Sequence, residues 1–346
     1  MAERVTVAVD ANGADLGPAE VAAGAAIAAE HGVRVLVFGP ADQIGDVPEG
    51  VEVVDAPVSI AKAPEPAYAV RETPDSSIVQ AAKAVAAGDA DAIVSNGSTG
   101  ALVAAGVLLI KRARGIHRPA LAIPLPIPGA PITLLDVGAN AEARPEHLVQ
   151  FAFMGAAFAR AILGVEAPRV GLLSNGEEPT KGTPDVIKAH ESLASRPGLD
   201  FVGNVEGTGL TAGLADVIVT DGFTGNVALK VMEATSGTVI GAVRDAATST
   251  TRAKAGGLLL KPALSSFRDE VDPEASGGAY LLGLRKLAVV SHGRFTRRGV
   301  ANSILAAERG VREEIVDRTH AALEAAGALR AKPPAASAET ASVGGS

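Results

Sequence analysis

Short runs of β-branched and aliphatic residues alternate along the chain with longer alanine-rich segments of helical period. Most of the short runs are continuously apolar, which is typical of strands buried on both faces of a sheet. The runs predict strands at 5–10, 33–39, 51–55, 92–95, 133–137, 170–175, 201–205, 217–221 and 287–291. The alternation predicts an α/β fold of three α/β/α layers, with a mainly parallel sheet between helices.

Two helices have the clearest apolar period. One begins near Pro145, a residue suited to a first helical position, and its positions 148, 151, 155 and 158 share one face. The other runs from about 299 to 326. We expect one α/β domain over 1–330, followed by a disordered tail at 331–346, where Ala, Ser, Pro and Gly dominate.

The composition argues against several classes of protein and several kinds of functional site. The 346 residues include no Cys, so disulfides, thiolate metal sites and a cysteine nucleophile are excluded. The net charge of -8 argues against a nucleic-acid binder. No apolar run reaches the 18 or so residues of a membrane span, and the first residues do not resemble a signal peptide, so a cytoplasmic protein is expected. The six histidines form no close pair, so no metal site is expected. No cofactor is expected either.

Loops rich in Gly, Asn and Asp follow five of the predicted strands. They lie at 10–15, 95–100, 136–140, 174–178 and 221–226. Ligands of open α/β sheets bind outside the carboxyl ends of strands, and helix N-termini there attract anions. For any one loop, ordinary capping explains the composition, but five together favour a shared anion site. The phosphate loop GxxxxGK[ST] and the nucleophile elbow GxSxG are absent from the sequence, so the loops alone define no reaction.

An ordered set of motifs resembles the phosphate acyltransferase family, the PlsX proteins of phospholipid synthesis. The segment DVIVTDGFTGNVALKVMEA at 216–234 resembles the family signature. The loops at 10–15, 95–101 and 136–142 resemble DxMGGD, SAGNTGA and DLGANVD, and 173–182 resembles LNxGEExxKG. The LLGLR and SHG segments within 278–293 resemble the family's late block. The match covers about residues 1–320. It departs from the family pattern at Asn12, Ala14, Asn96, Ser98 and Asn175.

The resemblance implies an enzyme that makes acyl phosphate from acyl carrier protein thioesters and inorganic phosphate. It also implies a dimer with a fold like that of phosphotransacetylases and isocitrate/isopropylmalate dehydrogenases. Phosphate is itself the nucleophile, which fits the absence of Cys. Three alternatives stay open: a phosphotransacetylase-like enzyme that uses acyl-CoA, a dehydrogenase, and a non-catalytic carrier-binding membrane adaptor. A dehydrogenase would need a nicotinamide site and an Asp cluster that the sequence does not offer.

The catalytic candidates are Lys181 as a cation for phosphate or oxyanion, Asn226 at a helix start, and His292 as a proton donor to the leaving thiolate. The candidates for binding phosphate or acyl group come from the strand-end loops. They are Asp10, Gly13, Ser95, Gly97, Ser98, Thr99, Gly100, Asn140, Gly176, Asp221, Gly222, Thr224 and Gly225.

Two basic clusters and one apolar segment are candidates for contacts with partners. Acyl carrier protein is acidic, so it should dock on a locally basic patch. The patches available are Lys111, Arg112, Arg114 and Arg118, and separately Arg294, Arg297 and Arg298. The segment 252–268, expected to protrude as two short pieces separated by Pro262, carries the candidates for membrane contact or dimer formation. These are Leu258, Leu259, Leu260, Leu264 and Phe267. We therefore expect peripheral membrane association and an interaction with a membrane glycerol-3-phosphate acyltransferase.

Overall fold

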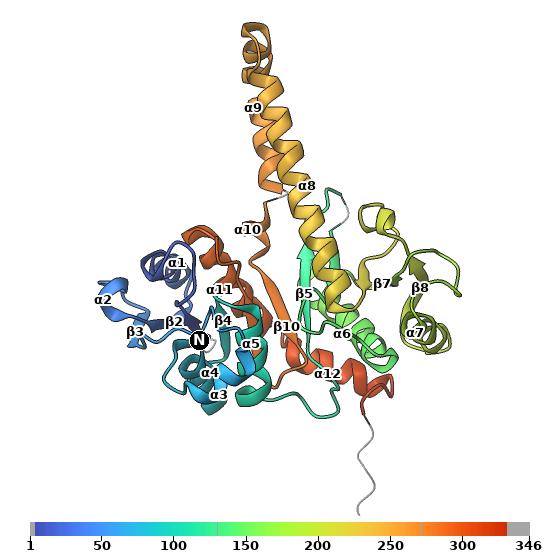
Figure 1. Cartoon of the computed structure of the whole chain (residues 1–346), viewed down its shortest axis with the longest axis horizontal. Coiled ribbons are helices and arrows are strands. Elements are labelled where there is room, and N and C mark those ends of the chain that lie inside the picture. The colour runs from blue at the N-terminus through green and yellow to red at the C-terminus, as the bar shows by residue number, and fades with distance from the viewer. Residues whose placement is uncertain (1–3, 130, 271, 331–346) are drawn as a thin grey trace, which may run out of the picture.

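The computed structural model describes residues 4–129, 131–270 and 272–330, which contain a single eleven-stranded sheet (Figure 1). The strand order is β3-β2-β1-β4-β11-β10-β5-β6-β9-β7-β8. The strands are β1 (Thr6–Asp10), β2 (Arg34–Gly39), β3 (Val51–Asp55), β4 (Ala92–Ser95), β5 (Ala120–Leu125), β6 (Ile132–Leu135), β7 (Arg169–Leu173), β8 (Asp200–Val205), β9 (Val217–Val219), β10 (Ala279–Leu282) and β11 (Leu287–Val290).

Helices cover both faces of this sheet and bury a separate apolar core on each side. One core gathers residues from α1 (Pro18–Glu30), α6 (Pro145–Leu163), α7 (Pro184–Ala194), α11 (Arg297–Arg312) and α12 (Ile315–Ala325). The other draws on α3 (Pro66–Glu72), α4 (Ser77–Ala87), α5 (Thr99–Ala105) and the start of α8 (Gly222–Thr248). The remaining α-helices are α2 (Ala41–Ile44), α9 (Thr251–Glu270) and α10 (Pro273–Ser276), and two short segments are a π-helix (Gly106–Ile110) and a 3-10 helix (Gly207–Thr211). The predicted three-layer α/β fold is confirmed.

The sheet consists of two parallel halves that run in opposite directions. The strands β3, β2, β1, β4 and β11 are parallel to one another, and so are β6, β9, β7 and β8. Between the halves, β10 pairs antiparallel with both β11 and β5, and β5 pairs antiparallel with β6. The loops that follow β1, β4 and β11 therefore lie at one edge of the sheet, and those that follow β6, β7 and β9 lie at the opposite edge.

Two features of the secondary structure differ from the prediction. Strands β5 and β10 were not expected; β5 contains Pro124, and β10 is a four-residue run close to Gly277, Gly278 and Gly283. The helix predicted at 299–326 is two helices, α11 and α12, because Glu314 adopts the left-handed backbone conformation (φ 51°) between them.

Helices α8 and α9 form an antiparallel hairpin that projects from the body (Figure 1). The prediction that Pro262 divides this region into two short pieces is wrong, because α9 continues through it from Thr251 to Glu270. Pro262 is exposed, so water can satisfy the carbonyl that loses its N–H partner. None of the helices in the described ranges is both long and apolar enough to cross a bilayer. The predicted disordered tail at 331–346 lies outside the described residues.

Candidate active site

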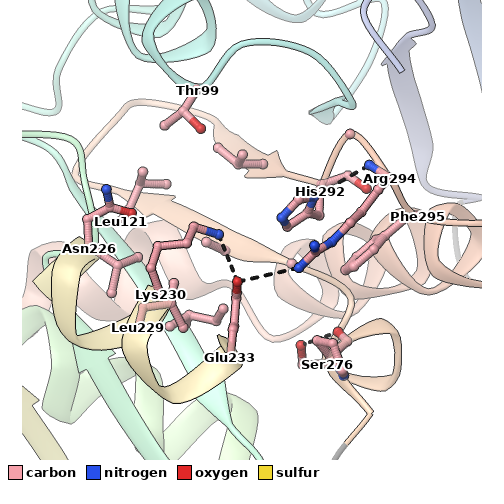
Figure 2. Close-up of a pocket in the computed structure, with 18 of the residues that line it drawn as sticks. Thr99, Leu121, Asn226, Leu229, Lys230, Glu233, Ser276, His292, Arg294 and Phe295 are labelled. Atoms are coloured by element: carbon pink, nitrogen blue, oxygen red, sulfur yellow. Dashed lines mark hydrogen bonds and ion pairs between the residues drawn. The ribbon is translucent and has the colours of Figure 1, made fainter. Parts of the chain in front are cut away.

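A cleft of about 260 Å³ lies between α8, the start of α5, strand β5 and the loop after β11 (Figure 2). Leu121, Ile123 and Val137 give it an apolar wall. Its polar lining side chains are Thr99, Asn226, Lys230, Glu233, Ser276, Ser291, His292 and Arg294, and Gly97 and Gly293 lie among them. The cleft therefore draws on both halves of the sheet.

One face of α8 supplies three of the polar side chains. Asn226, Lys230 and Glu233 are spaced by four and three residues, which places them on the same side of a helix. The helix start is fixed by Asp221, whose carboxylate accepts hydrogen bonds from Thr224 N and Thr224 Oγ1, both at 2.8 Å. Asp221 and Thr224 therefore cap α8 and position the residues that reach the cleft.

The two predicted glycines at the start of α8 allow it to approach the loop after β6. The N–H of Gly222 donates to the carbonyl of Asn140 at 2.7 Å. A Cβ at Gly225 would lie 1.9 Å from the carbonyl oxygen of Asp136, which no side chain could tolerate. Gly222 and Gly225 are therefore packing requirements of the helix start.

A carboxylate and two cations meet at the wall of the cleft. Lys230 Nζ lies 2.9 Å from Glu233 Oε2, and the guanidinium of Arg294 lies 3.6 Å from the same oxygen (Figure 2). Glu233 is mostly buried, whereas the side chains of Lys230 and Arg294 are 50% and 63% exposed. The cluster keeps one net positive charge, and both cations remain accessible to an anion.

His292 is half-buried in the loop after β11 and faces this cluster (Figure 2). Burial lowers the pKa of its imidazole, and the positive charges of Lys230 and Arg294 lower it further. Arg294 N donates to His292 Nδ1 at 3.4 Å, which leaves Nε2 as the other hydrogen-bonding atom of the ring. At neutral pH the ring is therefore neutral and can offer an N–H donor.

The predicted site residues Asp10 and Ser95 form a buried network behind the cleft. The carboxylate of Asp10 accepts hydrogen bonds from Ser77 Oγ at 2.6 Å, Ser95 Oγ at 2.8 Å and Asn12 N at 3.3 Å. Burial raises the pKa of Asp10 to about 6, and these hydrogen bonds oppose the rise. Asp10 and Ser95 therefore hold β1 and β4 together at the carboxyl ends of the strands.

Other predicted residues around β4 shape the loops of the same edge. Gly13 has φ +98°, and a Cβ there would lie 2.9 Å from the Cα of Gly97. Ser98 Oγ accepts from Ala101 N at 3.3 Å and so caps α5. Gly100 packs on Pro66. Neither atom of the Asn96 side-chain amide, which is buried, finds a hydrogen-bond partner among the described residues.

Asn140 belongs to a second buried network at the opposite edge of the sheet. Asp136 accepts hydrogen bonds from Asn140 N and Asn140 Nδ2, both at 2.8 Å, and from Leu121 N at 3.0 Å. Burial raises the pKa of Asp136, opposed by these donors. Asn140 thus braces the β6 loop, and its Nδ2 already donates to Asp136 and to the carbonyl of Pro119.

Lys181 lies on the loop after β7, at the edge opposite to His292. Its Cγ lies 2.6 Å from the position of a Cβ on Gly176, so the two residues pack against each other. Of the described residues that line the cleft, none comes from this loop. The cleft therefore brings together His292, Asn226, Thr99 and Gly97, and its lining does not include Lys181 or Gly176.

Lys230 is the cleft cation that the prediction missed. It lies within the motif at 216–234 and four residues after Asn226, so the helical spacing alone could have identified it. The described part of the chain contains no group of three or more histidine, aspartate or glutamate side chains arranged to hold a metal ion.

The two predicted basic clusters lie at different edges of the sheet. Lys111, Arg112, Arg114 and Arg118 are exposed on the segment before β5, which begins at the edge away from His292. Arg294 lines the cleft, and Arg297 and Arg298 follow at the start of α11. Arg297 pairs with Glu20 at 2.8 Å and Arg298 with Asp272 at 3.2 Å, yet both side chains stay more than half exposed.

Comparison with known proteins identifies the sequence relatives. A family model described as fatty acid synthesis protein matches residues 5–318. The phosphate acyltransferase of Pelotomaculum thermopropionicum is 40% identical over 325 residues, which cover 92% of this chain and 95% of that protein. The phosphate acyltransferase of a Geobacillus species is 41% identical over 324 residues, 92% of this chain and 98% of that protein.

Solved structures with the same fold include phosphotransacetylases. EutD phosphotransacetylase from Staphylococcus aureus has a TM-score of 0.58 and 17% identity, covering 88% of this chain and 94% of that one. A phosphotransacetylase from Streptococcus pyogenes has a TM-score of 0.56 and 16% identity, covering 90% and 95%. At such identities the likeness establishes the fold alone.

Proposed function

Since the chain belongs to the fatty acid synthesis protein family and its relatives are phosphate acyltransferases, we propose that it transfers an acyl group from acyl carrier protein to inorganic phosphate. The product, acyl phosphate, would supply phospholipid synthesis. The observation that carries the proposal is the convergence of Lys230, Arg294 and His292 beside an apolar wall in one cleft.

The cleft has the components that this reaction requires. Phosphate is a dianion for much of the time at neutral pH, and two accessible cations with a neutral amide and a hydroxyl can hold it. Lys230 and Arg294 supply the charge, and Asn226 and Thr99 supply hydrogen bonds. The enzyme then needs only to align the phosphate with the thioester and to stabilise the oxyanion.

In the proposed reaction, a phosphate oxygen attacks the thioester carbonyl, so that a C–O bond forms and the C–S bond breaks. The neutral imidazole of His292 donates a hydrogen bond to the carbonyl oxygen as negative charge develops on it. The hydrogen phosphate loses its proton to the departing sulfur, which leaves as a thiol. This assignment replaces the proton donor predicted from the sequence, because a lowered pKa makes His292 a poor reservoir of protons at neutral pH.

The decisive experiment incubates the protein with palmitoyl carrier protein and phosphate and traps acyl phosphate as hydroxamate with hydroxylamine. Hydroxamate that requires both substrates is expected. Palmitoyl-CoA at equal concentration tests the phosphotransacetylase-like alternative, since equal or greater turnover of palmitoyl-CoA would favour it. If neither donor gives a product, the result would favour the non-catalytic carrier-binding adaptor.

Dimerisation is supported by a stripe on the first turns of α8. Phe223, Val227 and Val231 recur every four residues and are 68%, 47% and 58% exposed. Exposed apolar side chains in such a row are typical of a face that is covered by a partner. We propose that a second copy covers it, which sedimentation of wild type and Val227→Glu would test.

We also propose that the protein associates peripherally with the membrane from the cytoplasmic side, and the α8/α9 hairpin supports the membrane contact. Leu258, Leu259 and Leu260 are 71%, 83% and 58% exposed, and Leu264 and Phe267 follow at 38% and 47%. Exposed Arg252, Lys254 and Lys261 accompany them on α9. Apolar side chains among cations suit the surface of an anionic bilayer. There the product would meet the membrane glycerol-3-phosphate acyltransferase.

A further inference from the structure

A second cavity of about 730 Å³ adjoins the cleft on the side of the helical hairpin. The end of β5 and the segment after it line one part of the cavity. This stretch, 123–128, contains three prolines together with Leu125 and Ile127. Helix α8 contributes Met232, Gly237 and Ile240 to the lining, and α9 contributes Phe267. We call this cavity the apolar groove. Its volume lies within the usual range for small-molecule sites.

The apolar groove and the polar cleft adjoin each other and share part of their lining. Ile123, Leu229, Glu233, Pro273, Ser276 and Arg294 line both. The ion pair between Glu233 and Arg294 marks the junction, with His292 and Lys230 on the cleft side and Met232 and Ile240 on the groove side. A molecule that lies across this junction must therefore have a polar, reactive end and a long apolar end.

We propose that the apolar groove holds the hydrocarbon tail of the acyl group and that the α8 position occupied by Gly237 sets how long that tail can be. This inference rests on the proposed function, because the tail must extend from a carbonyl placed beside His292. Each methylene removed from water strengthens binding by about fourfold. A groove of this kind therefore selects long chains through contacts that lie beyond the reacting atoms.

A side chain introduced at position 237 can enter the groove without displacing other atoms of the protein. It lines the groove, and a Cβ built on it meets no atom within 4 Å. Gly241, one turn further along α8, also has no atom within 4 Å of its Cβ position, and it borders neither the cleft nor the groove. Gly237→Leu and Gly241→Leu are therefore matched variants that differ in whether the new side chain enters the groove.

The test compares wild type, Gly237→Leu and Gly241→Leu with hexanoyl, decanoyl and palmitoyl carrier protein. Gly237→Leu should lower kcat/KM for palmitoyl carrier protein at least tenfold and change kcat/KM for hexanoyl carrier protein less than twofold. Gly241→Leu should leave both values unchanged. Equal effects of Gly237→Leu on all three donors would overturn the proposal.

A binding measurement keeps this result separate from the proposed function. Calorimetry with hexanoyl and palmitoyl phosphonate, two stable analogues of acyl phosphate, requires no turnover. Wild type should bind the palmitoyl compound at least tenfold more tightly, and Gly237→Leu should reduce that preference. Equal affinity of wild type for the two compounds would overturn the assignment of the groove as the site of the tail. Selective binding without any acyl phosphate formation would overturn only the proposed reaction.

Discussion

The carboxylate of Glu233 lies 3.6 Å from the guanidinium of Arg294, and this contact ties α8 to the loop after β11. Helix α8 begins after β9, at the edge of the sheet opposite to that loop. The helix thus carries Asn226, Lys230 and Glu233 across the face of the sheet to His292. The candidate site therefore depends on α8 bridging two halves of opposite direction, and not on a single row of strand ends.

Replacing Lys230 should weaken the use of phosphate. Lys230→Met removes a cation from the cleft and leaves Glu233 paired only with Arg294. We expect kcat/KM for phosphate to fall about 100-fold, close to the cost of losing one charged hydrogen bond to a transition state. The measurement is the rate of hydroxamate formation at increasing phosphate concentration with saturating palmitoyl carrier protein.

Lys181→Ala is the control for this experiment, because Lys181 was the phosphate cation predicted from the sequence and lies at the other edge of the sheet. A loss below threefold is expected. The opposite ranking of the two variants would return the role to Lys181 and contradict the cleft.

The loop of Lys181 and the loop of His292 follow strands of opposite direction because of two unpredicted strands. If all strands were parallel, the loops at 136–140, 174–178 and 221–226 would lie beside those at 10–15 and 95–100. The direction reverses between the halves because β10 and β5 pair antiparallel with their neighbours. Pro124 lowers the strand signal of β5, and β10 is only four residues long, so the reversal could not be predicted from local pattern.

The pH dependence should reveal the neutral state of His292. Because burial and nearby cations lower its pKa, the ring stays neutral down to a pH below its ordinary value. The rate per phosphate dianion should therefore stay level from pH 8 to about pH 6.5 and fall at lower pH, as the imidazole takes up a proton.

Substitution of His292 provides the matching test. His292→Ala should lower kcat about 100-fold or more, and His292→Gln, which keeps a neutral N–H donor, should lose less and lack the acid limb. A rate that rises as pH falls would instead support the proton-donor role.

Asp10 should make folding stability depend on pH. Its pKa is raised to about 6 in the folded protein from 3.8, so the folded state favours the protonated carboxyl. The contribution is fully present below pH 3.8 and is lost as pH rises through 6, by about 3 kcal/mol. Asp10→Asn lacks this dependence, so the stability of wild type relative to the variant should fall between pH 4.5 and pH 7.

Urea unfolding at pH 4.5, 5.5 and 7 measures this difference. Asp42→Asn, at an exposed position on α2, is the control and should show little pH dependence relative to wild type. A constant difference between wild type and Asp10→Asn would mean that Asp10 is ionised in the folded protein across the range.

Several residues of the cleft were predictable because their signals are local. Asn226, Thr99 and His292 follow strand ends in polar loops, and the structure places all three in the cleft. Asp10 and Ser95 have the same signal, but Ser95 Oγ donates a hydrogen bond to the Asp10 carboxylate. The sequence cannot distinguish a carboxylate that supports a loop from one that faces a ligand. That difference depends on Ser77, which comes from α4.

Carrier docking should be sensitive to the basic cluster beside the cleft. We propose that the acidic carrier approaches Arg294, Arg297 and Arg298, since its thioester must reach His292. Arg298→Ser should raise KM for the carrier about three- to tenfold without changing kcat, and added salt should reduce the difference. Arg118→Ser, in the cluster before β5, is the matched control; a larger effect there would place docking at the other edge.

Membrane association should depend on the apolar side chains of α9. Leu259 is 83% exposed, so Leu259→Glu adds a charge at no cost in packing and opposes contact with an anionic bilayer. We expect co-sedimentation with vesicles of phosphatidylglycerol to fall at least fivefold, with no change in activity on carrier substrates in solution. Leu214→Glu is the control on the body of the molecule, where Leu214 is 48% exposed. Equal binding by wild type and both variants would place the membrane contact elsewhere, and loss of activity together with binding would show that the hairpin also supports the cleft.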